Sequence, residues 1–220
     1  MIDILLRSKK LLKAKEFLKE QKAIADKFTD NQHFMTAHQL SQALIFKSSN
    51  RMRDKMQAVE LFAQIVYAKA YDFQFVVQAI PHYCELLFIE IKSLEDEEAL
   101  IEVKKVINRL EKIGTDQQSF SIIIKALILK AKLAVIEGQF GKVTELFEHA
   151  LEIANTNQLA QLRVEIETEK RVFENEMHKW KDLVDSNATM YERIEQTQIL
   201  DYINEVTRQF CLKKAEKSDA

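Results

Sequence analysis

The stretch that decides the fold is IIIKALILKAKLAVIEGQFGKVTELFEHALEIANTN, residues 122–157. Its apolar residues recur every three or four positions on both sides of Gly138, a spacing that is typical of two amphipathic helices. Gly138 can adopt the left-handed conformation that ends a helix without steric cost. Alanines stand where two helix backbones would approach, and phenylalanines are large enough to fill the space between helices. The stretch therefore predicts a helix–turn–helix unit that needs neighbours to bury its apolar faces.

This unit resembles a tetratricopeptide repeat. The residues that carry the resemblance are Ala131, Ala134, Gly138, Phe140, Val143, Phe147 and Ala150. Val143 replaces the alanine of that family, and Asn155 stands where a proline usually ends the unit. A weaker echo occurs in DKMQAVELFAQIV, residues 54–66, where Ala58 and Phe62 take matching positions. The resemblance implies a right-handed α-solenoid, in which the first helix of each pair lines a concave groove that binds another protein or a peptide.

The composition favours an all-α protein. Three glycines and one proline in 220 residues are too few for the frequent turns of a sheet protein. The commonest residues are good helix formers, and the length suits one substantial core or at most two domains.

The charge balance and the apolar segments exclude several classes of protein. With 32 basic and 34 acidic residues, the net charge of −2 gives no reason to expect direct nucleic-acid binding. Three lysines interrupt the most apolar segment, residues 120–136, so we expect no membrane span. The N-terminus lacks the features of a secretory signal, and the two cysteines lie far apart among apolar neighbours. These features predict a soluble, cytoplasmic protein with buried thiols.

Similar polar segments recur at intervals of about 41–44 residues, a period that suits helical hairpins. We expect each segment to supply an N-cap residue to the helix that follows, at Asp30, Asp72, Asp116 and Asn157. These caps divide the chain into a leading helix, residues 4–28, and helix pairs near residues 31–70, 72–113 and 116–155.

Three local signals refine these boundaries. Asp54 is expected to cap the second helix of the first pair, and Ser93–Asp96 offers a capping box to the second helix of the next. Pro81 falls inside a predicted helix, where it removes an amide donor and clashes with the preceding turn. We therefore expect a kink or break near residues 79–81.

The pattern changes after Gln158, because the rest of the chain contains no glycine or proline and more charge. We expect a long helix, a break at Ser186–Thr189 with a capping box from Thr189 to Glu192, and a final helix over residues 190–213 with a frayed end. The predicted domains are a solenoid, residues 1–185, and an extension, residues 186–220. The alternative is one continuous helix with a coiled-coil seam through Trp180, Asn187 and Ile194.

No convergent catalytic, cofactor-binding or metal-ligating set is visible, so we expect no enzyme and no cofactor. The five histidines lack ligand spacing, and no phosphate loop follows Gly138. The strongest candidates are residues expected to face the groove or to gather at the first inter-helix turn: Lys125, Ile128, Lys132, Ile136, Lys47 and Arg51. They would suit an acidic or amphipathic peptide, although solvated lysines on helix faces would give the same pattern.

The expected function is that of a scaffold or adaptor that binds another protein or peptide through the groove. One alternative is a structural homo-oligomer, such as a homodimer, assembled through the C-terminal residues Trp180, Val184, Ile199, Ile203, Val206 and Phe210. Another is a regulator of transcription that acts through a partner, because the chain shows no DNA-reading domain of its own.

Overall fold

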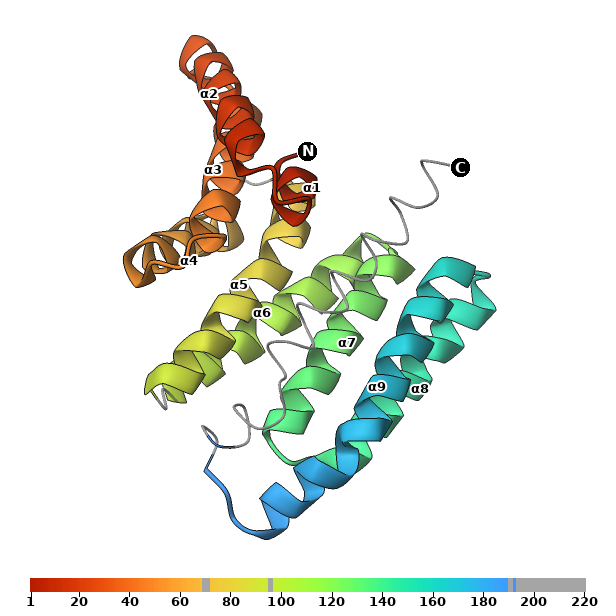
Figure 1. The fold of residues 1–220 in the computed structure, drawn as a ribbon. Helices are drawn as coiled ribbons and strands as arrows, with labels where there is room; N and C mark the ends of the chain where they lie inside the picture. The colour runs from red at the N-terminus through yellow and green to blue at the C-terminus, as the bar shows by residue number, and fades with distance from the viewer. Residues whose placement is uncertain (69–71, 95–96, 190–191, 193–220) are drawn as a thin grey trace. The chain divides into compact units, whose positions relative to one another are not determined.

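The structure, a computed structural model, describes residues 1–68, 72–94, 97–189 and 192, and these residues form helices joined by short turns (Figure 1). The described chain contains no strand, which confirms the all-α prediction. Two compact units divide it: the first comprises Met1–Leu86 and the second begins at Leu87. None of the described helices combines the length and the apolar character that a membrane crossing requires.

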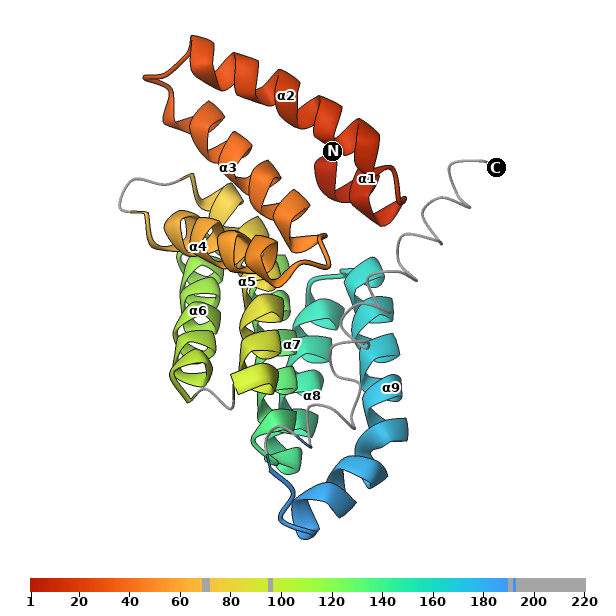
Figure 2. The same ribbon diagram turned by 60° about the vertical axis from the view of Figure 1, so that its left-hand side comes forward.

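The first unit contains α1 (Ile2–Arg7), α2 (Leu11–Lys27), α3 (Gln32–Lys47), α4 (Met52–Tyr67) and the first part of α5 (Phe73–Leu94). Helix α2 packs on α1 and α3, and α3 packs on α4 (Figure 2). The expected single leading helix is wrong, because the chain turns at Ser8–Lys10, where Lys9 has a φ of 56°. The predicted first pair is confirmed as α3 and α4.

The second unit contains the rest of α5, α6 (Glu97–Asp116), α7 (Phe120–Ile136), α8 (Phe140–Thr156) and α9 (Ala160–Asp185). Helix α6 packs on α7, α7 on α8, and α8 on α9, and α7 also contacts α9. Figures 1 and 2 both draw α7, α8 and α9 side by side. Ala131, Ala134, Phe147 and Ala150, four of the residues that carry the repeat resemblance, are buried, and the helices that contain them, α7 and α8, pack on each other.

Five helices end in the same backbone geometry. Each has a residue of positive φ after its last turn, at Lys9, Gln118, Gly138, Gln158 and Asn187. The amide of that residue donates to the carbonyl three residues earlier, and the next amide donates to the carbonyl five residues before it, as in Gly138 N–Val135 O at 2.9 Å and Gln139 N–Ala134 O at 2.8 Å. This is the Schellman motif, which satisfies the last carbonyls of a helix. Only Gly138 among the five lacks a side chain, so the other four tolerate a left-handed conformation that is unfavourable for L-residues.

The predicted N-caps are confirmed at one of four positions. The Asp72 carboxylate accepts a hydrogen bond from the Gln74 amide at 3.2 Å, before α5 begins. Before α3, the capping side chain is Asn31, one residue after the expected Asp30, and it accepts from the His33 amide at 3.0 Å. Asp116 and Asn157 are wrong, because they lie at helix C-termini: Asp116 ends α6 and Asn157 is the C-cap of α8.

The finer boundary signals gave mixed results. Asp54 does not cap α4, which begins at Met52; its carboxylate instead accepts from the Ser49 hydroxyl at 2.5 Å. Of the kink or break expected near residues 79–81, the break is wrong, because α5 continues as one helix from Phe73 to Leu94 with Pro81 inside it. The kink stays a prediction. The proposed capping box at Ser93–Asp96 lies outside the side chains that the structure describes.

The break after α9 is confirmed. Helix α9 ends at Asp185 with Ser186 as its C-cap, and Asn187 has a φ of 54°. Thr189 and Glu192 form the expected capping box: the Thr189 amide donates to the Glu192 carboxylate at 2.8 Å, and the Glu192 amide donates to the Thr189 hydroxyl at 3.2 Å. The alternative of one continuous helix through Asn187 is therefore wrong. The final helix predicted beyond this point lies outside the described residues.

Candidate functional site

The residues predicted to line the groove in the second unit do not share an open face. Lys125 is exposed on α7, whereas Ile128, Lys132 and Ile136 are buried. The reason is that α7 packs against α6, α8 and α9, which cover most of its circumference. The expectation of one open surface through these four residues is thus corrected, and their role in binding a partner stays a prediction.

Lys132 instead forms a buried ion pair. Its ammonium lies 3.2 Å and 3.3 Å from the two carboxylate oxygens of Glu169 on α9, with both side chains almost completely buried. Glu165 lies one turn earlier on α9. Burial raises the pKa of the Glu165 carboxyl and the charge of Glu169 raises it further, while Lys125 and Lys132 act in the opposite direction. This cluster holds α7 to α9 and leaves little of its charge for a ligand.

A second polar cluster lies in the first unit and contains Lys47, His82 and Glu85. Lys47 pairs with the Glu85 carboxylate, and its ammonium lies 2.8 Å from His82 Nδ1. Burial lowers the pKa of His82 well below its ordinary value, and the charges of Lys47 and Arg7 lower it further. The neutral imidazole can then accept, at Nδ1, a hydrogen bond from the Lys47 ammonium. The His82 ring also stacks on Phe62, with the ring centroids 6.0 Å apart.

Lys47 and Arg51 were expected to gather at the first inter-helix turn, and the structure gives them different environments. Lys47 is a partly buried ion-pair member, whereas Arg51 is the exposed N-cap residue of α4. The partners of Lys47 were missed. The signal that was present is the spacing of His82 and Glu85, three positions apart inside an apolar helix, which places both side chains on one face.

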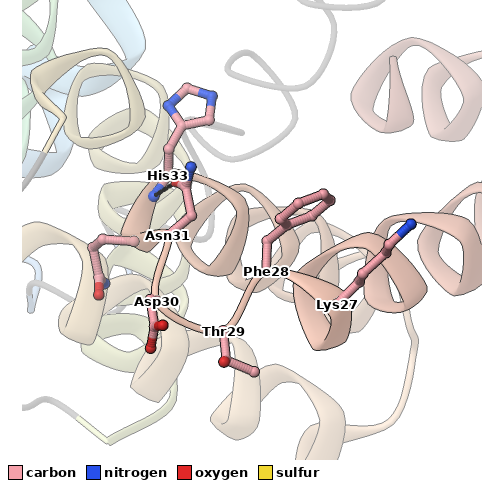
Figure 3. Close-up of a pocket in the computed structure, with 7 residues that line it drawn as sticks. Lys27, Phe28, Thr29, Asp30, Asn31 and His33 are labelled. Atoms are coloured by element: carbon pink, nitrogen blue, oxygen red, sulfur yellow. Dashed lines mark hydrogen bonds between the residues drawn. The ribbon is translucent and has the colours of Figure 1, made fainter.

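A shallow hollow lies at the turn between α2 and α3 (Figure 3). Residues 27–33 line it, with Phe28 labelled between Lys27 and the turn that leads to His33. The Lys27 ammonium lies 5.7 Å from the centroid of the Phe28 ring, and Phe28 is 48% exposed. His33 Nδ1 lies 3.1 Å from the Asp72 carboxylate, so the polar wall of this hollow is partly occupied by contacts within the unit.

A more open surface runs along α2. Five exposed side chains lie on its outward side, and we name them the α2 stripe: Leu11, Leu12, Lys15, Lys19 and Lys22. Leu12 is 79% exposed and Leu11 is 42% exposed. None of the three lysines forms an ion pair within the part of the chain that the structure describes. These residues were not among the binding candidates predicted from the sequence.

The remaining predicted residues belong to the C-terminal interface. Val184 is partly exposed on the last turn of α9. The side chain of Trp180 is not among those described, and Ile199, Ile203, Val206 and Phe210 lie outside the described residues. Among the side chains that are described, no group of three or more histidine, cysteine or carboxylate residues has a geometry that suits a metal ion.

Comparison with known proteins gave no match to a family model, to a curated protein or to a solved structure. No residue role is therefore transferred from another protein. The resemblance of residues 122–157 to a tetratricopeptide repeat stays a prediction from the sequence.

Proposed function

We propose that this chain is a non-enzymatic scaffold that binds another protein or a peptide, built as a right-handed α-solenoid of tetratricopeptide-like helix pairs. The observation that carries the proposal is the repetition in the second unit. Gln118, Gly138 and Gln158 end successive helices in the same way, and they are spaced twenty residues apart. Helix α7 contacts both its hairpin partner α8 and the following helix α9, as helices do in stacked hairpins.

Stacked helical hairpins present an extended surface and rarely enclose a small-molecule pocket, which favours a protein or a peptide as the ligand. The polar clusters support the same conclusion. Lys132 with Glu169, and Lys47 with Glu85, are ion pairs that link two helices, which is a structural role. We place this scaffold in the cytoplasm, because its two distant cysteines suit a reducing compartment.

The test is affinity capture from a native lysate with the full chain, in parallel with a chain that ends at Asp185. An unrelated helical protein of similar net charge is the control. We expect a protein that is retained by both chains but not by the control, and that binds the purified chain directly with a defined stoichiometry in titration calorimetry.

Two outcomes would contradict the proposal. If retention or self-association is lost with residues 186–220, the C-terminal oligomer replaces the solenoid scaffold as the better description. If no captured protein binds the purified chain directly, the scaffold function is wrong.

A further inference from the structure

The charge on the outward side of α2 is distributed unevenly. At about 100° per residue, the five members of the α2 stripe fall within a sector of about 100°. Asp26 adds a carboxylate to that sector beyond Lys22, and the charges of both Lys22 and Asp26 act on His38 of α3. The adjoining sector, in contrast, has equal numbers of positive and negative charges, from Lys13, Glu16, Glu20 and Lys27. One side of the helix is therefore basic and the next is neutral.

Asp26, four residues after Lys22, offsets only part of the positive charge on this side. Lys15 and Lys19 are four residues apart and Lys19 and Lys22 three apart, which are spacings at which like charges on a helix repel each other. The ion pair near the N-terminus does not relieve this repulsion, because it joins Arg7 to Asp3 within α1. A ligand that places carboxylates opposite these lysines would remove the repulsion and add attraction.

We propose that the α2 stripe is a docking surface for an acidic amphipathic helix of a partner protein. The inference rests on the proposed function and names the class of partner. The stripe spans about 16 Å of helix, or about three turns, at the edge of the first unit beside α1 and α3 (Figure 2). Carboxylates on successive turns of the partner face Lys15, Lys19 and Lys22, and an apolar side chain at one end covers Leu11 and Leu12.

A lipid surface fits these features less well. A helix that lies on a membrane needs an apolar face along its length. Ala14 and Ala25 are buried where α2 meets its neighbours, and the exposed large apolar side chains of α2 lie only near its ends, with Leu11 and Leu12 at one and Ile24 at the other. A partner helix needs only a local apolar contact together with complementary charges.

The experiment selects binders from a phage-displayed library of helical peptides with one randomised face, using the immobilised full chain. The triple variant Lys15→Glu/Lys19→Glu/Lys22→Glu reverses the stripe. The matched control Lys9→Glu/Lys13→Glu/Lys27→Glu makes the same change in net charge with exposed lysines outside it. Circular dichroism checks that both variants keep the helical content and the melting temperature of the parent.

We expect the enriched peptides to carry acidic residues three and four positions apart beside an apolar residue. Their affinity should fall at least about tenfold in the stripe variant and less than about threefold in the control, and it should weaken with added salt. Equal losses in the two variants, or enriched peptides without an acidic bias, would overturn the proposal.

A parallel sedimentation assay uses vesicles of phosphatidylserine and phosphatidylcholine. If the parent binds these vesicles, the stripe variant does not, and no acidic peptide binds the parent, the surface is a lipid-binding surface instead. If a directly bound partner from the lysate binds the stripe variant unchanged, the scaffold function stands and the assignment of its site to α2 is wrong.

Discussion

At the scale of single residues, two glycines of the second unit illustrate opposite requirements. Gly114 lies in the last turn of α6, where a Cβ atom would lie 2.9 Å from Ile123 Cγ1 and 3.0 Å from the Ile123 backbone nitrogen on α7. Gly141 lies near the start of α8, where a Cβ atom would meet nothing within 4 Å. The first glycine permits two helices to approach, and the second only weakens its own helix.

We predict that Gly114→Ala lowers the free energy of unfolding by about 1–3 kcal/mol, because the backbone of α7 cannot move aside as a flexible side chain would. Gly141→Ala is the matched control and should raise it by about 0.5–1 kcal/mol, since alanine is the better helix former. Urea unfolding followed by circular dichroism measures both changes. If Gly114→Ala leaves the free energy of unfolding unchanged, α6 and α7 approach each other less closely at this position.

The lowered pKa of His82 predicts that the stability of the fold depends on pH. Its pKa in the folded protein is lowered well below the value of 6.5 that applies to the unfolded chain. Below about pH 6.5 the unfolded state therefore binds a proton that the folded state does not, and the free energy of unfolding falls as the pH falls, by at most about 1.4 kcal/mol per pH unit for this group.

The variant His82→Asn can still accept from Lys47 but does not titrate, so its stability should fall less steeply between pH 6.5 and 5. His149→Asn, at an exposed position, is the control and should keep the parent slope. Unfolding midpoints in urea at several pH values give the slopes. Identical slopes in the parent and in His82→Asn would contradict the lowered pKa of His82 in the folded protein.

At the scale of helices, the ion pair of Lys132 and Glu169 is the polar link between α7 and α9. Removing one member leaves a buried charge without its partner, so Lys132→Met should lower the free energy of unfolding by about 3–5 kcal/mol. The double variant Lys132→Met/Glu169→Leu replaces the pair by apolar side chains and should recover most of that loss.

The exposed pair of Lys112 and Asp116 within α6 provides the control, and Lys112→Met should change stability by less than about 1 kcal/mol. Urea unfolding of the parent, the single variants Lys132→Met and Glu169→Leu, and the double variant measures the coupling between Lys132 and Glu169. Losses that simply add in the double variant would show that the two side chains do not depend on each other.

The helical class and the approximate positions of α7 and α8 followed from the sequence. The exact helix ends and the side-chain partners largely did not. The apolar period over residues 120–156 identified α7 and α8 because it needs no tertiary information. Asp116 and Asn157 were assigned to the wrong helix, since a polar residue between two helices can end one or begin the next. Pro81 was misjudged because tertiary packing can hold a helix through a proline that would break an isolated one.

At the scale of the molecule, the nearly balanced charge concealed the surface that we consider most open to a partner. A net charge of −2 averages over the whole chain, but the segment from Arg7 to Lys15 contains five basic residues and no acidic one. The burial of Lys132 was missed for a related reason. Lys125 and Lys132 were judged from one helix alone, and whether a lysine faces solvent or an ion-pair partner depends on the helix that packs beside it.

The repeated helix ends also restrict how a chain of this kind can change in length over evolutionary time. Helices α7 and α8 each contain 17 residues and are each followed by a three-residue turn, so one helix and its turn form a segment of twenty residues. Because successive helices run in opposite directions, gaining or losing one such segment would reverse every helix after it. A gain or loss of two segments preserves direction and packing, so lineages that share this architecture should differ in steps of about forty residues.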